Sequence, residues 1–192
     1  MPSGPAYTPC LRANYDNKLG TGWNVPCLKS GRTLHALSTN EKALFYAAIL
    51  DPEVLDLREQ YPVLDRPQLS RYLEDPSLRI PRSKVSTFDL VLTRINPTRL
   101  AGIAYQAINV KPLAELGVST RRFNREEHLC DAIGWEWGLF TNLERIDQRT
   151  QTASEIVHRL KALEVEELRQ PALDLVPAVK RCGLLPVSKT PC

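Results

Sequence analysis

The order of hydrophobic patterns between Ser38 and Thr141 is the feature that most limits how this 192-residue chain can fold. Apolar residues at helical spacing come first, then runs rich in β-branched and aromatic residues, then a second helical pattern and a last strand-like run. Each such element has to bury its apolar face against another layer. We therefore expect a mixed α/β domain in which a central mixed sheet is flanked by helices.

The first expected helix begins after Ser38. Ser38 and Glu41 stand at the spacing of a capping box, in which the two side chains satisfy free backbone N–H groups at the start of a helix. Leu44, Phe45 and Ala48 then supply an apolar stripe. Local pattern alone therefore favours a capped, amphipathic helix at this position.

Strands are expected in the segments that follow. Apolar residues favour a strand over residues 54–64, and the Pro-rich residues 66–82 are expected to form mostly loop. The segments Ser86–Thr93 and Leu100–Lys111 are rich in β-branched and aromatic residues, with a turn expected at residues 95–99. These segments predict the greater part of the sheet.

A second helix and a further strand complete the expected domain. The helix is expected over residues 121–133, with Ile133 on its apolar stripe and Gly134 as the residue that ends it. The run Trp135–Thr141 predicts a strand, and a helical pattern returns over Thr152–Leu168.

The two ends of the chain are expected to form extended arms. Proline clusters near both ends, and proline fixes φ and lacks a backbone N–H. We expect an N-terminal arm over residues 1–30, a domain over 31–145, and a helix with a Pro-rich tail over 146–192. Tyr15 and Trp23 are expected to anchor the first arm on a neighbouring element or another chain.

Charge and cysteine content narrow the function classes. The net charge of +3 permits nucleic-acid binding without requiring it. The five cysteines include no close pair and no Cys/His ligand spacing, so neither a disulfide framework nor a zinc site is expected. The longest apolar run, Ala43–Leu50, is too short to cross a bilayer. We expect a cytoplasmic protein without a membrane partner.

Four charged residues stand where apolar neighbours predominate. Asp89 lies inside an apolar strand, and Lys111 ends the next one. Glu41 and Glu126 share helical faces with apolar residues. Carboxylates on such faces are costly to bury unless they are paired or bind a metal ion. These four residues are the candidate catalytic residues.

Each candidate also has an ordinary structural interpretation. Glu41 can simply cap its helix, Asp89 can face solvent on a half-exposed sheet, and Lys111 can be a strand-end charge. Glu126 can be one of several surface charges, with Glu127 beside it. Taken together, however, two carboxylates around a divalent ion and a lysine near the attacking water are the parts that phosphodiester hydrolysis needs.

Several segments of the chain resemble, in the right order, the N-terminal nuclease domain of TnsA transposon endonucleases. The segments are Ser30–Tyr46, Val54–Asp65, Ser86–Thr93, Ala107–Pro112 and Trp135–Thr141. The most specific is the string DLREQYP at Asp56–Pro62, and the resemblance covers about Ser30 to Leu143. It implies a restriction-endonuclease-like fold and a Mg²⁺- or Mn²⁺-dependent cut in double-stranded DNA at a transposon end, made beside a transposase and an ATPase regulator.

The resemblance also assigns expected roles to particular residues. Glu41 matches the helical acid of the family, Asp89 the metal-binding aspartate, and Lys111 the active-site lysine. Glu126 matches the later helical acid, with Glu127 as the alternative.

The expected metal site departs from the family at one position. Where the nuclease class usually has Glu or Gln two residues before the lysine, this chain has Asn109, which has a carbonyl oxygen but a shorter reach and no charge. The backbone carbonyl of Val110 is expected as a further ligand, with Glu41 and Asp89 completing the set. Arg121, Arg122 and Arg125, which cluster in the second helix, are expected to contact DNA.

Two other function classes stay open at this level. TnsA proteins continue into a further domain that contacts partners, whereas a short Pro-rich segment follows Thr141 here. A phage head-completion or neck protein that keeps the nuclease fold in a structural role would fit this pattern, with portal or neck proteins as partners and the virion as its location. A plain DNA-binding module is a third alternative, although the chain has no helix-turn-helix signature.

Overall fold

The computed structural model describes residues 3–10, 22–27, 29–63, 85–146 and 148–160. The chain divides into two compact units, residues 1–154 and residues 155–192. Of the second unit, residues 155–160 are described, as the end of helix α5 (Gln148–Leu160). The expected loop at 66–82, the anchor Tyr15, and the part of the predicted last helix beyond Leu160 lie outside the described residues.

A four-stranded mixed sheet forms the centre of the first unit, as the sequence predicts. Its strands are β3 (Val54–Val63), β4 (Ser86–Ile95), β5 (Ile103–Val110) and β6 (Glu136–Phe140), in that spatial order. The first two pairings are antiparallel and β5 pairs with β6 in parallel. A parallel pair needs a crossover connection, and helix α3 (Leu116–Ile133) is that crossover.

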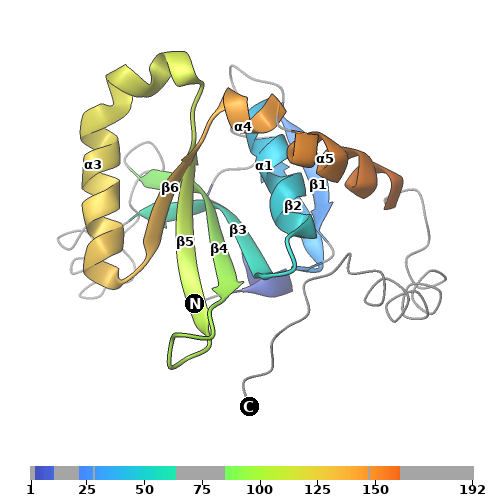
Figure 1. The fold of residues 1–192 in the computed structure, drawn as a ribbon, viewed down its shortest axis with the longest axis horizontal. Coiled ribbons are helices and arrows are strands. Elements are labelled where there is room, and N and C mark those ends of the chain that lie inside the picture. The colour runs from blue at the N-terminus through green and yellow to red at the C-terminus, as the bar shows by residue number, and fades with distance from the viewer. Residues whose placement is uncertain (1–2, 11–21, 28, 64–84, 147, 161–192) are drawn as a thin grey trace. The chain divides into compact units, whose positions relative to one another are not determined.

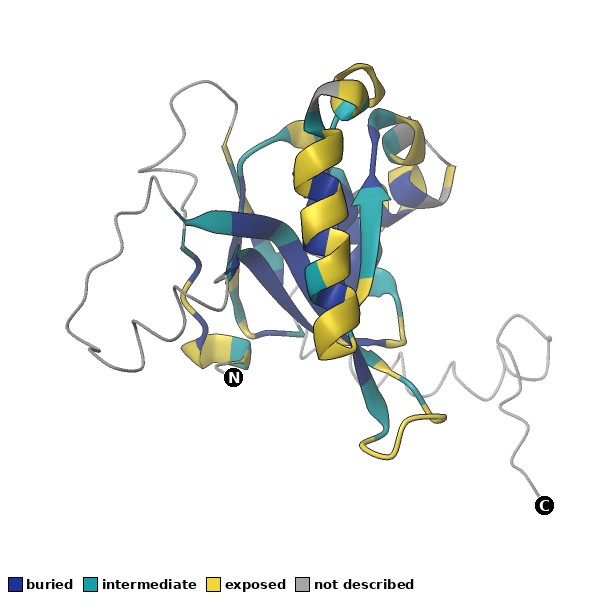
Figure 2. Ribbon diagram, turned by 90° about the vertical axis from the view of Figure 1, so that its left-hand side faces the viewer, coloured by how far each residue is buried: buried dark blue, intermediate teal, exposed yellow. Residues whose placement is uncertain are grey.

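Helices flank this sheet. Figure 1 shows α3 on one side of it and α1 (Thr39–Leu50) on the other. Cys130 of α3 lies in a buried cluster with strand residues that include Val91 and Ala107. Figure 2 shows the exposed outer surface of α3 and the buried residues beneath it. The remaining short helices are η1 (Gly4–Ala6), η3 (Leu113–Glu115) and α4 (Asn142–Ile146). None of the described helices is long and apolar enough to span a membrane.

Ser38 is confirmed as the N-cap of α1, while the Glu41 carboxylate accepts from the residue before the cap. The backbone N–H of Glu41 donates to Ser38 Oγ at 3.1 Å, and the N–H of Leu37 donates to Glu41 Oε2 at 2.9 Å. Gly134 ends α3 in the left-handed region, with φ of 73°, as the sequence also predicts.

The N-terminal residues depart from the predicted arm. Strand β1 (Trp23–Cys27) pairs antiparallel with β2 (Arg32–Ala36) in a hairpin whose turn includes Gly31 at φ of 65°. The prediction of an arm over residues 1–30 is therefore wrong for β1. Pro26 made this segment look unlike a strand, but a two-stranded sheet has free edges, where a missing N–H is tolerated. Trp23 packs within its own chain, because the Lys42 ammonium lies 3.7 Å from its ring centroid.

Three element boundaries also differ from the prediction. Helix α3 begins at Leu116 rather than Arg121, and Ile133 is half exposed because it ends the helix. Strand β5 begins at Ile103 rather than Leu100, because the backbone N–H of Asn96 donates to Gly102 O at 2.9 Å and closes a wider turn. Helix α5 begins before the predicted Thr152, and α4 was not predicted.

Candidate active site

The candidate site lies where two central strands part. The ladder between β4 and β5 ends at the pair Leu90–Ile108. Further along, β4 pairs with β3 and β5 pairs with β6. Asp89 and Asn109 are the next residue of each strand, so they lie across from one another at the point of separation. The N–H of Val110 donates to Asp89 Oδ2 at 2.6 Å, so this carboxylate satisfies a backbone group of the neighbouring strand.

Glu41 reaches this point from α1 and keeps its role in the helix cap. Its carboxylate accepts hydrogen bonds from Leu37 N–H, from Ser38 Oγ at 3.0 Å and from Gln60 Nε2 at 3.2 Å. Burial and the nearby negative charge of Asp89 raise the pKa of Glu41 to about 7. Burial also raises the pKa of Asp89. The two acids therefore share one electrostatic environment.

Gln60 joins these two acids and was not identified from the sequence. It is buried in β3 and donates from Nε2 to Glu41, and its side chain also donates to the carboxylate of Asp89. Thr87 Oγ1 donates to Gln60 Oε1 at 3.1 Å, which fixes the orientation of the amide. The Gln60 backbone adopts φ of 48°, in a region that non-glycine residues rarely occupy. The only sequence signal was its place in the string DLREQYP.

Lys111 follows directly after β5. Its backbone N–H donates to Phe140 O at 3.0 Å, which holds the residue at the end of the parallel pair. The positive charge of Lys111 acts to lower the pKa of Asp89, against the larger effect of burial. Its Nζ lies 3.8 Å from Glu115 Oε2, and the side chain is partly exposed. The ammonium therefore lies at the solvent side of the acids.

Glu126 approaches from α3 and is fully buried, with 0% of its side chain exposed. Arg122 Nε donates to Glu126 Oε1 at 2.7 Å, and Asn109 Nδ2 donates to Glu126 Oε2 at 2.5 Å. Both carboxylate oxygens are thus engaged by side chains. The alternative residue, Glu127, is exposed, whereas Glu126 is buried, so Glu126 is the acid that faces the sheet.

The three arginines predicted to bind DNA differ in their surroundings. Arg122 pairs with Glu126 and also donates to Thr87 O at 2.9 Å, although 41% of its side chain is exposed. Arg121 and Arg125 are exposed, and Arg125 lies 3.4 Å from Ser86 Oγ.

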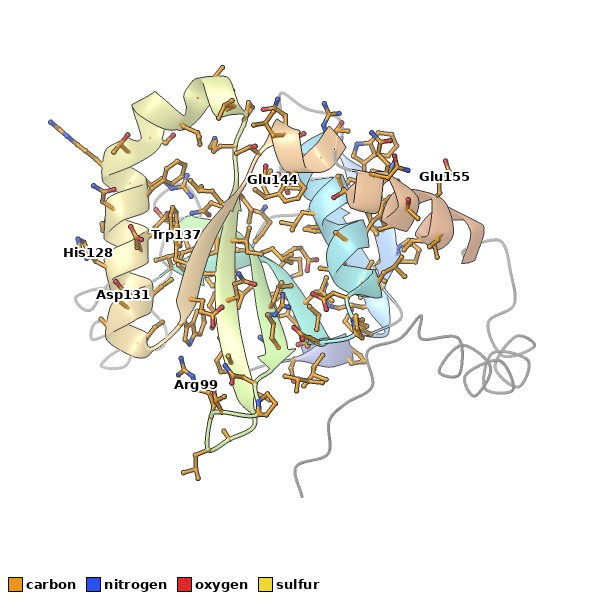
Figure 3. The ribbon with its side chains drawn as sticks, viewed as in Figure 1. Arg99, His128, Asp131, Trp137, Glu144 and Glu155 are labelled. Atoms are coloured by element: carbon orange, nitrogen blue, oxygen red, sulfur yellow. The ribbon has the colours of Figure 1, made fainter. Side chains whose placement is uncertain are left out.

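The outer surface of α3 also carries exposed residues near these arginines. Figure 3 shows His128 on the side of α3 that faces away from the sheet, and Trp137 between β6 and the helix; Asp131 is also exposed. The Trp137 ring packs against Phe123 with centroids 5.7 Å apart, which fixes α3 on the sheet.

The donor set fits a hard divalent cation. Glu41 and Asp89 supply carboxylate oxygens, and such oxygens are the ligands that Mg²⁺ and Mn²⁺ prefer. Asn109 Oδ1 is buried and has no hydrogen-bond partner in the part of the chain that the structure describes. An unpaired buried carbonyl on the residue across from Asp89 is available as a further oxygen ligand.

No protein-family model matches the chain, and no curated protein matches it. The order of elements, the site geometry and the resemblance of these segments are therefore the features that bear on function.

Proposed function

We propose that this chain is a metal-dependent DNA endonuclease of the TnsA type, with a restriction-endonuclease-like fold, that hydrolyses a phosphodiester at a transposon end. The observation that supports the proposal is the convergence of Glu41, Asp89 and Lys111 where β4 and β5 part. A transposase and an ATPase regulator are its proposed partners, and the cytoplasm its proposed location.

In the proposed hydrolysis, the metal-binding side chains and Lys111 would have separate roles. Glu41, Asp89 and the carbonyl oxygen of Asn109 would hold Mg²⁺ or Mn²⁺, with the Val110 backbone beside them. The bound ion would lower the pKa of a water molecule and neutralise charge on the phosphate. Lys111, at the solvent side of Asp89, is placed to orient the attacking water or to contact the phosphate.

Nicking of supercoiled DNA in Mn²⁺ tests the proposal. We expect nicking by the wild-type chain and its loss, by at least about a hundredfold, in Asp89→Ala and Lys111→Ala, because each removes a group that touches the ion or the reacting phosphate. Glu127→Ala is the matched control, since Glu127 is exposed one residue from the buried Glu126. The control should nick like the wild type.

The assay also separates the other function classes. A folded chain that binds Mn²⁺ but stays inert on DNA with its partners present, and that is a stoichiometric component of virions, would contradict the proposal and support the head-completion or neck role. Salt-dependent DNA binding without cleavage would indicate a DNA-binding module instead.

A further inference from the structure

Glu126 does not reach the parting of the strands itself. One of its oxygens accepts from Arg122 and the other from Asn109, and its side chain is fully buried. A carboxylate with both oxygens engaged in this way cannot approach a substrate without breaking one of these contacts. Asn109, which lies across from Asp89, connects Glu126 to the site by a hydrogen bond, while the charge of Arg122 also acts on Asp89.

The contact with Glu126 determines how the Asn109 amide is turned. An ionised carboxylate only accepts hydrogen bonds, so the amide NH₂ has to face Glu126 and the carbonyl oxygen has to face away from it. That oxygen, Oδ1, is buried, since Asn109 is only 1% exposed. It has no hydrogen-bond partner among the described residues. Where folded proteins leave a buried polar atom unpaired by protein groups, a bound water or ion is one of the common reasons.

We infer that Glu126 is a positioning residue that acts through Asn109, holding the Asn109 carbonyl oxygen toward Asp89 as the third side-chain ligand of the divalent cation. The inference rests on the proposed function and gives Glu126 a different task from the catalytic one that the sequence predicts. The Arg122 guanidinium lies 2.7 Å from the buried Glu126 carboxylate and is its ion-pair partner. That guanidinium is part of this support for the site, rather than free for DNA.

The first test removes the acceptor that fixes Asn109. In Glu126→Gln the new amide offers a donor as well as an acceptor, so the Asn109 side chain is free to turn over. We expect the Mn²⁺ affinity, measured by calorimetry, to fall about 10- to 100-fold, the usual effect of losing a group that orients a metal ligand. Glu127→Gln, which makes the same change on the exposed neighbour, should bind Mn²⁺ like the wild type.

A reversed pair provides the sharper test. Asn109→Asp alone sets two buried carboxylates against each other and should weaken folding. Combined with Glu126→Gln, it restores one hydrogen bond with donor and acceptor exchanged, and leaves an oxygen at position 109 for the ion. We expect the double variant to bind Mn²⁺ at least as tightly as the wild type, although Glu126→Gln alone weakens binding by about tenfold or more.

A second double-mutant cycle, with Asn109→Ala, tests the role of Glu126 if Asn109→Asp fails to fold. Asn109→Ala removes the ligand oxygen, so Glu126→Gln should cause no further loss of Mn²⁺ affinity in that background. Additive losses, or wild-type affinity in Glu126→Gln, would overturn the inference. The proposed function would survive that result if Asp89→Ala still abolished Mn²⁺ binding. A wild-type chain that binds no Mn²⁺ would overturn both.

Discussion

At the scale of single residues, Glu41 combines a structural and a chemical position. The same carboxylate caps α1 and lies beside the acid of β4, where burial and the charge of Asp89 raise its pKa to about 7. A raised pKa means that the folded chain prefers the protonated form of this acid. Near neutral pH a large share of the molecules therefore carry a proton on Glu41 that a cation would displace.

This shift predicts how stability depends on pH. The pKa of Glu41 is raised from 4.5 to about 7, so the folded state binds more protons than the unfolded state between these values. The contribution of Glu41 to stability therefore falls as pH rises from about 4.5 to about 7 and then levels off, because proton binding that favours the folded state is lost over that interval. Urea unfolding in EDTA at several pH values measures this.

Glu41→Gln is the matched variant, because glutamine keeps a carbonyl acceptor for the Leu37 N–H but does not titrate. We expect it to flatten the fall in stability, and we expect saturating Mn²⁺ to do the same in the wild type. A wild-type chain whose stability, relative to that of Glu41→Gln, rises through this interval would show that the acids are not coupled as described.

The candidate site was partly predictable from the sequence at this scale. Asp89 could be found because a charge inside an apolar strand needs an explanation, and Glu126 because it shares a face with apolar residues. Gln60 could not be found. A polar residue in a strand is ordinarily read as solvent-facing, and a positive φ at a non-glycine residue depends on tertiary contacts that no local pattern encodes.

At the scale of elements, local signals located most helices and strands but not the feature that makes the site. The capping box, the helix-ending glycine and the β-branched runs each act within a few residues, so they can be read from the chain. The parting of β4 from β5 depends on which strand each end pairs with, which is a non-local choice. Hairpin β1–β2 was missed for the local reason that proline normally argues against a strand.

Gly117 in the first turn of α3 and Gly134, which ends the helix, allow the two helix boundaries to be tested by the same substitution. Gly134→Ala should destabilise the fold by about 1–2 kcal/mol, because alanine is strained at φ of 73°, while the added Cβ would meet only ordinary contact at 3.6 Å. Gly117→Ala, inside the first turn with no atom within 4 Å of the added Cβ, should stabilise by about 0.5–1 kcal/mol. Chemical denaturation measures both. Changes of the same sign would contradict the helix boundaries described here.

At the scale of the whole molecule, the net charge of +3 is too small for DNA binding to be explained by overall charge. The local arrangement on α3 is more informative than the total. Its inner side carries Glu126 beside the site, and its outer surface carries Arg121 and Arg125, both exposed. One helix thus joins the proposed contact with DNA to the support of the proposed metal site.

This arrangement predicts that two of the three arginines of α3 affect DNA affinity and that the third affects Mn²⁺ affinity. Arg121→Ala and Arg125→Ala should weaken DNA binding about equally for all sequences and reduce the slope of log affinity against log salt by about 1 each, because each removes one phosphate contact. Neither should change Mn²⁺ affinity. Arg122→Ala should lower Mn²⁺ affinity instead, since it removes the partner of Glu126.

Fluorescence anisotropy with labelled duplex DNA over a range of salt concentrations, together with Mn²⁺ calorimetry, measures both effects. Arg99→Ala is the control, because Arg99 is exposed in the turn between β4 and β5, at the opposite end of these strands from the point where they part. If Arg99→Ala weakened DNA binding as much as Arg125→Ala, the charge of the chain as a whole would explain the binding. Because the net charge is so small, we expect the position of each arginine on α3 to decide the result.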